Sequence, residues 1–187
     1  MPRSLAGRAV QLQPAGPVGR FRCPVHCSWP AGLSPNPRFQ TPCSTLDILP
    51  TCCAAMGVDA PADRPIDGVD ILPLLSDPAA DRPRPVCYRF LDRKDKMFDA
   101  PTFAVMDGQW KFLTNLDAAG AHDQLYDMVA DLGETTNVLD EHPDLQRMYR
   151  EQLTEFLDSC RRSHAGDDYD RPVDMVTPFQ EPGGWAD

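Results

Sequence analysis

The cysteines are the residues of this sequence that most directly suggest chemistry. There are seven, and the segment Cys23-Pro-Val-His-Cys27 has a spacing that could supply zinc ligands, with Cys52 and Cys53 as further candidates. A structural zinc site needs four ligands, however, and no second closely spaced Cys or His pair accompanies the first. Cys52 and Cys53 also fall on an apolar helical stripe, where cysteine behaves as a small buried hydrophobic residue. We therefore assign no metal ligand, and a small zinc-binding module stays an alternative.

Other patterns that carry chemistry are weak or missing. The sequence has no G-x-S-x-G nucleophile elbow, no G-x-G-x-x-G dinucleotide loop and no G-x-x-x-x-G-K-[ST] phosphate loop. Asp167, Asp168 and Asp170 form an acidic cluster. Calcium needs about six to eight oxygen ligands in a shaped loop, so we interpret this cluster as part of a solvated tail. His142 precedes Pro143 and is interpreted as a helix-start residue. No catalytic residue is assigned.

The clearest element that could position side chains is a β-hairpin. Two apolar runs, Thr102–Met106 and Gln109–Leu113, flank the pair Asp107-Gly108. An Asp-Gly pair favours a type I′ turn, because that turn needs positive φ at both central residues. Residues 86–90 and 124–128 have the pattern of further strands. We therefore expect an antiparallel sheet of three to four strands.

A long C-terminal amphipathic helix is predicted to pack against this sheet. Pro143 suits its first position and Gly166 its end. Arg161, Arg162 and His164 lie near its C-terminal end, where cations interact favourably with the helix dipole. One face carries the apolar residues Leu145, Met148, Tyr149, Leu153, Phe156, Leu157 and Cys160. A small antiparallel sheet covered by one helix defines an α+β fold.

A shorter helix is expected before the sheet. Its apolar residues recur at helical spacing: Leu46, Leu49, Cys52, Cys53 and Met56. Ser44 and Asp47 resemble a capping box at its start. Pro50 leaves two possibilities: the helix begins late enough for Pro50 to lie in its first turn, or it kinks there. Residues 69–75 are then expected to form one helical turn packed on the core.

The overall charge excludes some classes of partner. The chain has 187 residues, of which 18 are basic and 28 acidic, so its net charge is −10. Such a chain lacks the clustered lysines and arginines that neutralise phosphates, which argues against nucleic-acid binding. No run of about 18 apolar residues is present to span a membrane. The start of the chain lacks the apolar segment of a secretory signal, so the sequence as it stands indicates a cytoplasmic location.

The charge distribution suggests three parts. Residues 1–46 contain five arginines and no acidic residue, and Asp47 is the first carboxylate. Residues 1–20 are interpreted as a disordered or non-homologous tail, for which translation out of frame is one hypothesis. Residues 21–165 are expected to form the folded part, and residues 166–187 an extended acidic tail containing proline and glycine.

Five short motifs follow one another over residues 21–160. They are Phe21-Arg-Cys-Pro24 through Trp29-Pro30; Ser44–Thr51; Asp67-Gly68-Val69 with Leu72–Leu75; Asp107–Lys111; and Leu125–Asp127 with Asp131, Glu134 and Asn137. Each motif alone is weak, but their order is specific. Together they resemble the C-terminal portion of a sulfatase of the alkaline-phosphatase-like superfamily, and they are similar to arylsulfatases and N-acetylgalactosamine-6-sulfatase-like enzymes within it. The resemblance implies a sulfatase C-terminal subdomain, in which one helix covers a small sheet.

The catalytic centre of that family has no counterpart in this sequence. The resemblance implies a formylglycine nucleophile, made from the cysteine or serine of C-x-P-S-R, and a calcium ion held by Asp and Asn side chains. No cysteine here lies in C-x-P-S-R. The family's sulfate-binding lysine precedes the R-x-P strand, whereas the first lysine here is Lys94. We therefore expect calcium and formylglycine only in the intact family enzyme, a missing N-terminal catalytic domain as the partner, and no activity from this chain alone.

One charged segment could contact substrate. Arg93 and Lys94 lie between predicted strands, and the resemblance implies that the small C-terminal domain borders the active-site cleft. Because a planar guanidinium suits oxyanions, we name these two as candidate substrate-binding residues for a sulfated sugar. The other interpretation is an exposed loop in which Asp92 and Asp95 offset the cations. From a different class, a non-enzymatic interaction module stays an alternative, and it would need an exposed apolar patch.

Overall fold

The described part of the chain has the predicted α+β architecture. The computed structural model describes residues 29, 33, 42–77, 80–89 and 103–168. The elements, in chain order, are η1 (Thr45–Asp47), α1 (Ile48–Met56), α2 (Leu72–Ser76), β1 (Val86–Arg89), β2 (Phe103–Asp107), β3 (Trp110–Thr114), β4 (Gln124–Asp127), η2 (Leu139–Glu141) and α3 (Pro143–Ala165). The predicted tail at residues 1–20, and most of the one at 166–187, lie outside the described residues.

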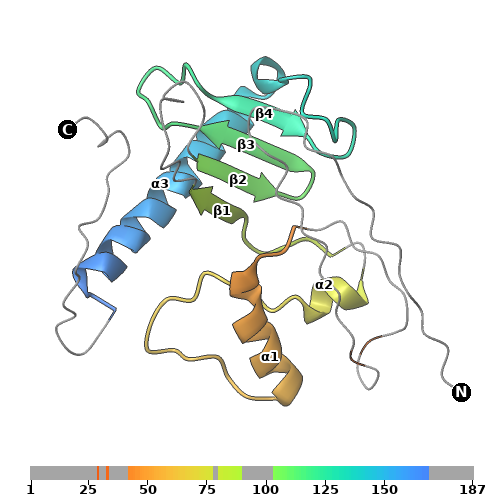
Figure 1. The fold of residues 1–187 in the computed structure, drawn as a ribbon, viewed down its shortest axis with the longest axis vertical. Coiled ribbons are helices and arrows are strands. Elements are labelled where there is room, and N and C mark those ends of the chain that lie inside the picture. Colours follow the sequence, from red (N-terminus) through yellow and green to blue (C-terminus); the bar gives the residue numbers. More distant parts are fainter. Residues whose placement is uncertain (1–28, 30–32, 34–41, 78–79, 90–102, 169–187) are drawn as a thin grey trace, which may run out of the picture.

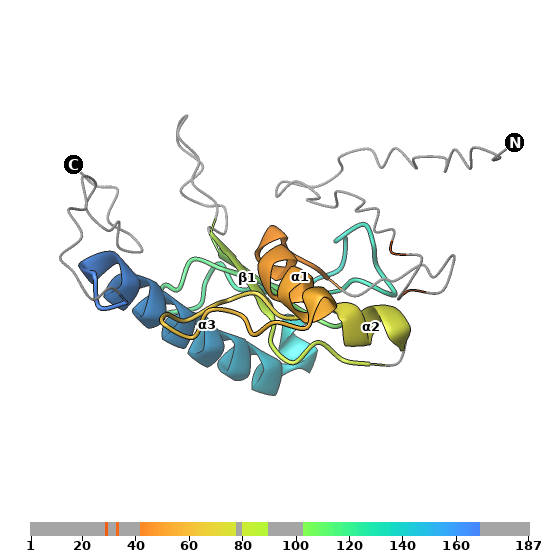
Figure 2. The same ribbon diagram turned by 90° about the horizontal axis from the view of Figure 1, so that it is seen from below.

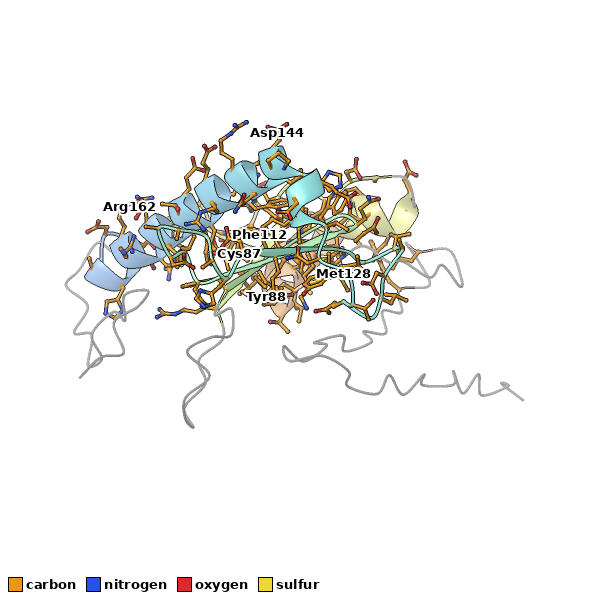
Figure 3. All side chains as sticks on the ribbon, turned by 90° about the horizontal axis from the view of Figure 1, so that it is seen from above. Cys87, Tyr88, Phe112, Met128, Asp144 and Arg162 are labelled. Carbon is orange, nitrogen blue, oxygen red and sulfur yellow. The ribbon has the colours of Figure 1, made fainter. Side chains whose placement is uncertain are left out.

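The described strands form one antiparallel sheet in the order β1-β2-β3-β4, as Figure 1 shows. In its register, Cys87 lies beside Val105, Val105 beside Phe112, and Phe112 beside Leu125. Because side chains alternate along a strand, these four residues form one row on the same face of the sheet. Figure 3 shows Cys87 and Phe112 between the sheet and α3, with Tyr88 on the other side of the sheet.

The predicted hairpin forms, but its turn is shifted by one residue. Asp107 pairs with Trp110, so the central residues of the turn are Gly108 and Gln109. Gly108 has a φ of 53°, and Gln109 is not among the described residues with positive φ. Positive φ at the first central residue alone is the pattern of a type II′ turn, not the predicted type I′. The shift keeps Asp107 in β2, where its carboxylate accepts a 3.3 Å hydrogen bond from the Tyr149 hydroxyl.

Helix α3 packs on the sheet through the face that its periodicity predicted. The buried core that they share consists of Phe103, Val105, Phe112, Leu125, Tyr149, Leu153 and Leu157. Pro143 is the first residue of α3, and Gly166 ends it with a φ of 95°. Figure 2 shows α3 lying along one face of the sheet. The sheet and α3 therefore build the main hydrophobic core among the described residues.

The predicted helix before the sheet is divided into η1 and α1. Helix α1 begins at Ile48, so Pro50 lies in its first turn, where backbone N–H groups have no partner within the helix. This confirms the first of the two predicted possibilities. The predicted capping box also forms: the Ser44 side chain accepts a 3.3 Å hydrogen bond from Leu46 N, and Ser44 N donates to the Asp47 carboxylate at 2.7 Å.

Helices α1 and α2 lie beyond the β1 edge of the sheet, away from α3 (Figure 1). The predicted helical turn forms as α2, and Val69 before it and Leu74 within it are buried. Neither residue belongs to the core between the sheet and α3, so the predicted packing on that core is not seen. Among the described residues, no helix is long and apolar enough to cross a membrane.

Candidate functional site

The two predicted substrate-binding residues, Arg93 and Lys94, lie outside the described residues. The candidate zinc ligands Cys23 and Cys27 lie outside them as well. Within the described ranges, no group of three or more His, Cys, Asp or Glu residues could hold a metal ion. The remaining candidates are the other polar and apolar groups that the fold brings together.

Several thiols sit in surroundings that keep them protonated. Burial, together with the charges of Asp67 and Cys160, raises the pKa of Cys87 to about 12. Burial also raises the pKa of Cys160 and that of Cys43. Because the thiolate is the nucleophile and the metal ligand, these three side chains are poorly suited to either role near neutral pH.

Asp47 is the centre of a buried ion pair that joins η1 to the segment before β1. It is 1% exposed, and Arg82 approaches it with Nη1 at 2.8 Å from Oδ2 and Nη2 at 2.7 Å from Oδ1. The backbone N–H groups of Ser44 and Val69 donate to the same carboxylate at 2.7 and 2.8 Å. Burial by itself raises the pKa of Asp47, but these hydrogen bonds outweigh it, so the pKa lies below its ordinary value. The hydrogen bonds of this carboxylate therefore hold separate segments of the chain together.

Gly68 allows the Asp-Gly-Val motif to lie directly against η1. A Cβ atom at this position would stand 2.0 Å from the carbonyl oxygen of Leu46. No side chain fits at that distance, so the close approach of the two backbones requires glycine. Arg84 Nη2 then donates to the carbonyl oxygens of Ile66 and Gly68, both at 2.9 Å. This motif is therefore a packing feature.

A second buried ion pair joins the hairpin motif to the loop after β4. Lys111 Nζ lies 2.7 Å from Glu134 Oε2, and both side chains are buried. The loop is shaped by two further residues of the motif to which Glu134 belongs. Asp131 accepts a 2.6 Å hydrogen bond from Thr135 N, and Asn137 Oδ1 accepts one of 2.9 Å from the backbone of β4. Lys111 is therefore neutralised within the fold.

A third polar cluster, which the sequence analysis did not single out, fastens α3 to the loop before β4. The buried Asp123 carboxylate accepts hydrogen bonds from Thr114 Oγ1 at 2.6 Å, Gln146 Nε2 at 2.9 Å and Arg150 Nη1 at 2.7 Å. Arg150 Nη2 also donates to the backbone oxygen of Asp117 at 2.6 Å. These partners lie 9, 23 and 27 residues from Asp123, so no local pattern signals the cluster.

Asp117 belongs to the same loop, and the pKa of its carboxyl group is clearly lowered. Hydrogen bonds from the backbone N–H of Ala121 and from the His122 ring lower the pKa of Asp117 to about 2. The Ala121 bond is 3.0 Å long, and His122 Nδ1 lies 3.1 Å from Asp117 Oδ2. This carboxylate closes its own turn and stays ionised at neutral pH.

The sulfatase-like motifs in the described residues thus coincide with structural contacts. Asp47, Gly68 and Lys111 each hold two distant segments together, and none of them presents a free reactive group to solvent. The arrangement has the properties of a scaffold, because the charged side chains of Asp47 and Lys111 are already paired within the fold.

Helix α1 presents the one large apolar surface that we find among the described residues. We call it the α1 apolar face. It consists of Leu46, Ile48, Leu49, Met56 and Val58, which are 50% to 69% exposed, together with the exposed Cys52. The prediction that Cys52 is buried is therefore wrong, whereas Cys53 is buried as expected. Scattered exposed apolar residues are normal, but six of them within residues 46–58 make this segment a candidate interaction surface.

Comparison with known proteins identifies the family. The model of the C-terminal part of N-sulphoglucosamine sulphohydrolase matches residues 19–162. The chain belongs to this sulfatase family, which confirms the resemblance predicted from its motifs.

The individual relatives are sulfatases named for different substrates. The chain is 28% identical to mouse steryl-sulfatase, over 78% of this chain and 26% of the relative. It is 28% identical to N-acetylgalactosamine-6-O-sulfatase of Bacteroides thetaiotaomicron, over 75% of this chain and 27% of the relative. A solved sulfatase structure from studies of glycosaminoglycan metabolism by Bacteroides thetaiotaomicron is 27% identical with a TM-score of 0.48, over 71% of this chain and 27% of that one. The chain thus spans about a quarter of the length of the curated relatives that it matches.

Proposed function

We propose that this chain contributes the C-terminal portion of a sulfuric ester hydrolase and hydrolyses no sulfate ester by itself. The observation that carries the proposal is the family match over residues 19–162. It is supported by the length of the matches, because this chain aligns with only about a quarter of each relative. The sequence also has no C-x-P-S-R segment from which a formylglycine nucleophile is made. The remaining part of the enzyme is therefore the proposed partner.

The described residues do not fit the calcium ion that the resemblance implies. Such an ion takes about six to eight oxygen ligands, whereas the described part of the chain offers no group of three or more candidate ligand residues. The most buried carboxylates, Asp47 and Asp123, are occupied by arginine and by backbone or side-chain donors. The metal and the nucleophile are accordingly proposed to belong to the catalytic portion.

The proposed substrates are aryl or sugar sulfate esters. This proposal is supported by the N-acetylgalactosamine-6-O-sulfatase and by mouse arylsulfatase K, which are named for such esters. The steryl-sulfatase and the choline-sulfatase of Rhizobium meliloti, the latter 32% identical, are named for other sulfate esters. Arg93 and Lys94 are the proposed contacts to a sulfated sugar, because a guanidinium and an ammonium can bind sulfate oxygens by charge-assisted hydrogen bonds.

A tethered protein tests the proposal. The full chain would be fused behind the portion of the Bacteroides thetaiotaomicron N-acetylgalactosamine-6-O-sulfatase that precedes its match to this chain, in cells that produce formylglycine. A tether raises the effective concentration of the two parts to about the millimolar range, so weak docking suffices. We expect the fusion to release sulfate from N-acetylgalactosamine-6-sulfate or an aryl sulfate. The truncated relative alone and this chain alone are both expected to release none.

The same fusion tests the two basic residues. Replacing Arg93 and Lys94 by Ala is expected to raise KM for the sulfated sugar about tenfold, with a smaller effect on a small aryl sulfate. Arg147→Ala is the matched control, because this arginine is exposed and paired with Asp144 on α3. A fusion that folds but is inactive toward both substrates would contradict the proposed function, and equal KM values would contradict the substrate contact.

A non-enzymatic interaction module is the second candidate, and the α1 apolar face favours it. In that case the fusion would hydrolyse nothing, although the chain would still bind another protein through this surface. The activity of the fusion therefore separates the two candidates.

A further inference from the structure

We propose that the α1 apolar face is the surface on which the catalytic portion of a sulfatase docks. The inference rests on the proposed function, because it names the part of this chain that meets the proposed partner. The occupant is an apolar surface on the polypeptide that makes up the remaining three quarters or so of the curated relatives.

The composition of α1 is the first argument. The nine residues Ile48–Met56 have the sequence ILPTCCAAM, which contains no charged residue. A helix without a polar face is characteristic of an element that is buried on all sides. In this structure, by contrast, most of its side chains are exposed, with Cys53 buried. The sequence of α1 is therefore suited to a more enclosed position than the described residues provide.

The geometry of α1 is the second argument. At about 100° per residue, Ile48, Leu49, Cys52 and Met56 fall within an arc of about 100° on one side of the helix. Leu46 and Val58, just before and just after α1, are exposed as well. One side of α1 is therefore apolar along its length, as expected of a helix that inserts into a complementary groove.

The place of α1 in the chain identifies the occupant. The family match is to a C-terminal portion, so in the relatives the additional polypeptide precedes the matched residues 19–162. Helix α1 is the first α-helix of the described residues, and it lies beyond the β1 edge, apart from the core between the sheet and α3 (Figures 1 and 2). It is therefore the described helix nearest in sequence to the additional polypeptide, and its free side does not contribute to the core already formed.

The anchoring of α1 is the third argument. The buried Asp47–Arg82 pair and the contact of Gly68 with η1 fix the start of the helix to the rest of the fold. Thr51 Oγ1 accepts a 3.1 Å hydrogen bond from Ile71 N, which holds the inner side of α1 against the start of α2. A rigidly held apolar helix loses little conformational entropy on docking, so its exposed area contributes efficiently to binding.

Cys52 provides a direct probe, because it lies in the centre of the α1 apolar face and is exposed. The rate at which a maleimide modifies Cys52 would be measured by peptide mapping in the full chain alone and in the tethered protein described above. Cys52→Ser identifies the signal. We expect modification to be at least tenfold slower in the tethered protein, because docking covers this thiol.

Two pairs of substitutions distinguish the α1 apolar face from other apolar surface. Ile48→Gln with Met56→Gln is expected to restore rapid modification of Cys52 in the tethered protein. Val129→Gln with Leu132→Gln, at two exposed apolar residues of the loop after β4, is the matched control and is expected to leave Cys52 protected. Because all four side chains are exposed, the melting temperature of the isolated chain is expected to change little in both variants. This measurement shows whether the variants fold.

The outcomes separate this inference from the proposed function. A tethered protein that hydrolyses sulfate esters while Cys52 stays reactive would overturn the docking surface and keep the function. Protection of Cys52 without hydrolysis would support the docking surface and contradict the function. Protection of Cys52 in the isolated chain, together with a sedimenting dimer, would make a second copy the occupant and overturn the inference.

Discussion

Asp47 illustrates how a single buried charge can organise a segment of nearly forty residues, from Ser44 to Arg82. Its carboxylate receives donors from Ser44, Val69 and Arg82, which come from three separate stretches of chain. Removing one partner of such a pair leaves the other charge buried and uncompensated, and this strongly lowers the free energy of unfolding. Replacing both partners by apolar residues is much less costly. The Asp144–Arg147 pair on the exposed side of α3 has no such consequence, because water solvates both charges; Figure 3 shows Asp144 pointing away from the molecule.

Arg82→Met is therefore expected to lower the free energy of unfolding by about 3–5 kcal/mol. The matched control Arg147→Met, at the exposed pair, is expected to change it by less than about 1 kcal/mol. Urea unfolding followed by circular dichroism measures both. Similar losses for the two variants would show that the buried pair has no special role.

Among the structural elements, α1 and α3 show how the same helical periodicity leads to two different outcomes. In α3, the apolar residues Tyr149, Leu153 and Leu157 are buried against the sheet. In α1, Ile48 and Met56 stay exposed, and the helix is held in place by contacts at its start. Helical spacing of apolar residues therefore indicates which residues share a face, and the tertiary structure determines what that face meets.

Gly68→Ala is expected to destabilise the junction between η1 and the segment before α2 by about 3 kcal/mol, at the upper end of the usual cost of overpacking. The cause is the 2.0 Å approach of the added Cβ to the backbone of Leu46, which cannot move as a flexible side chain can.

Gly57→Ala is the matched control. Gly57 has a φ of 68°, and no atom lies within 4 Å of a Cβ added to it. The free energy of unfolding of this variant should therefore fall by about 1–2 kcal/mol through backbone strain alone. Chemical unfolding of both variants measures the difference. A Gly68→Ala variant as stable as Gly57→Ala would contradict the close approach of the two backbones.

At the scale of the whole molecule, carboxylates stabilised by hydrogen bonds make folding sensitive to acid. The pKa of Asp117 is lowered to about 2 by hydrogen bonds from Ala121 and His122. The pKa of Asp131 is lowered chiefly by the backbone N–H of Thr136, and Asp47 is shifted in the same direction. With folded pKa values below the ordinary value of about 3.9, the unfolded chain binds more protons in acid. The stabilisation is therefore complete above about pH 5 and is lost as the pH falls through the folded values.

The melting temperature is accordingly expected to be nearly constant from about pH 7 to pH 5 and to fall steadily between about pH 4 and pH 2. Asp117→Asn, which cannot titrate at that position, should make the decline less steep. Calorimetry or circular dichroism at a series of pH values measures the effect. A melting temperature that stays constant or rises between pH 4 and pH 2 would contradict the assignment.

Much of the fold could be predicted from the sequence because its signals are local. The hairpin, the capping box at Ser44 and the amphipathic face of α3 depend on residues a few positions apart, and all three form as predicted, apart from the one-residue shift of the turn. The motifs also predicted the sulfatase family correctly. The candidate substrate contacts at Arg93 and Lys94 stay predictions, because they lie outside the described residues.

Local sequence patterns are enough to predict the longer helices, the strands, the family and the lack of a C-x-P-S-R nucleophile segment. The helix η2 was not predicted from them. Only the folded chain shows that Asp47 pairs with Arg82, 35 residues away, and that Asp123 gathers Thr114, Gln146 and Arg150. It also shows that one side of α1 is left uncovered. Helix and turn formation depend on neighbouring residues, whereas ion pairs and burial depend on which distant segments the packing brings together.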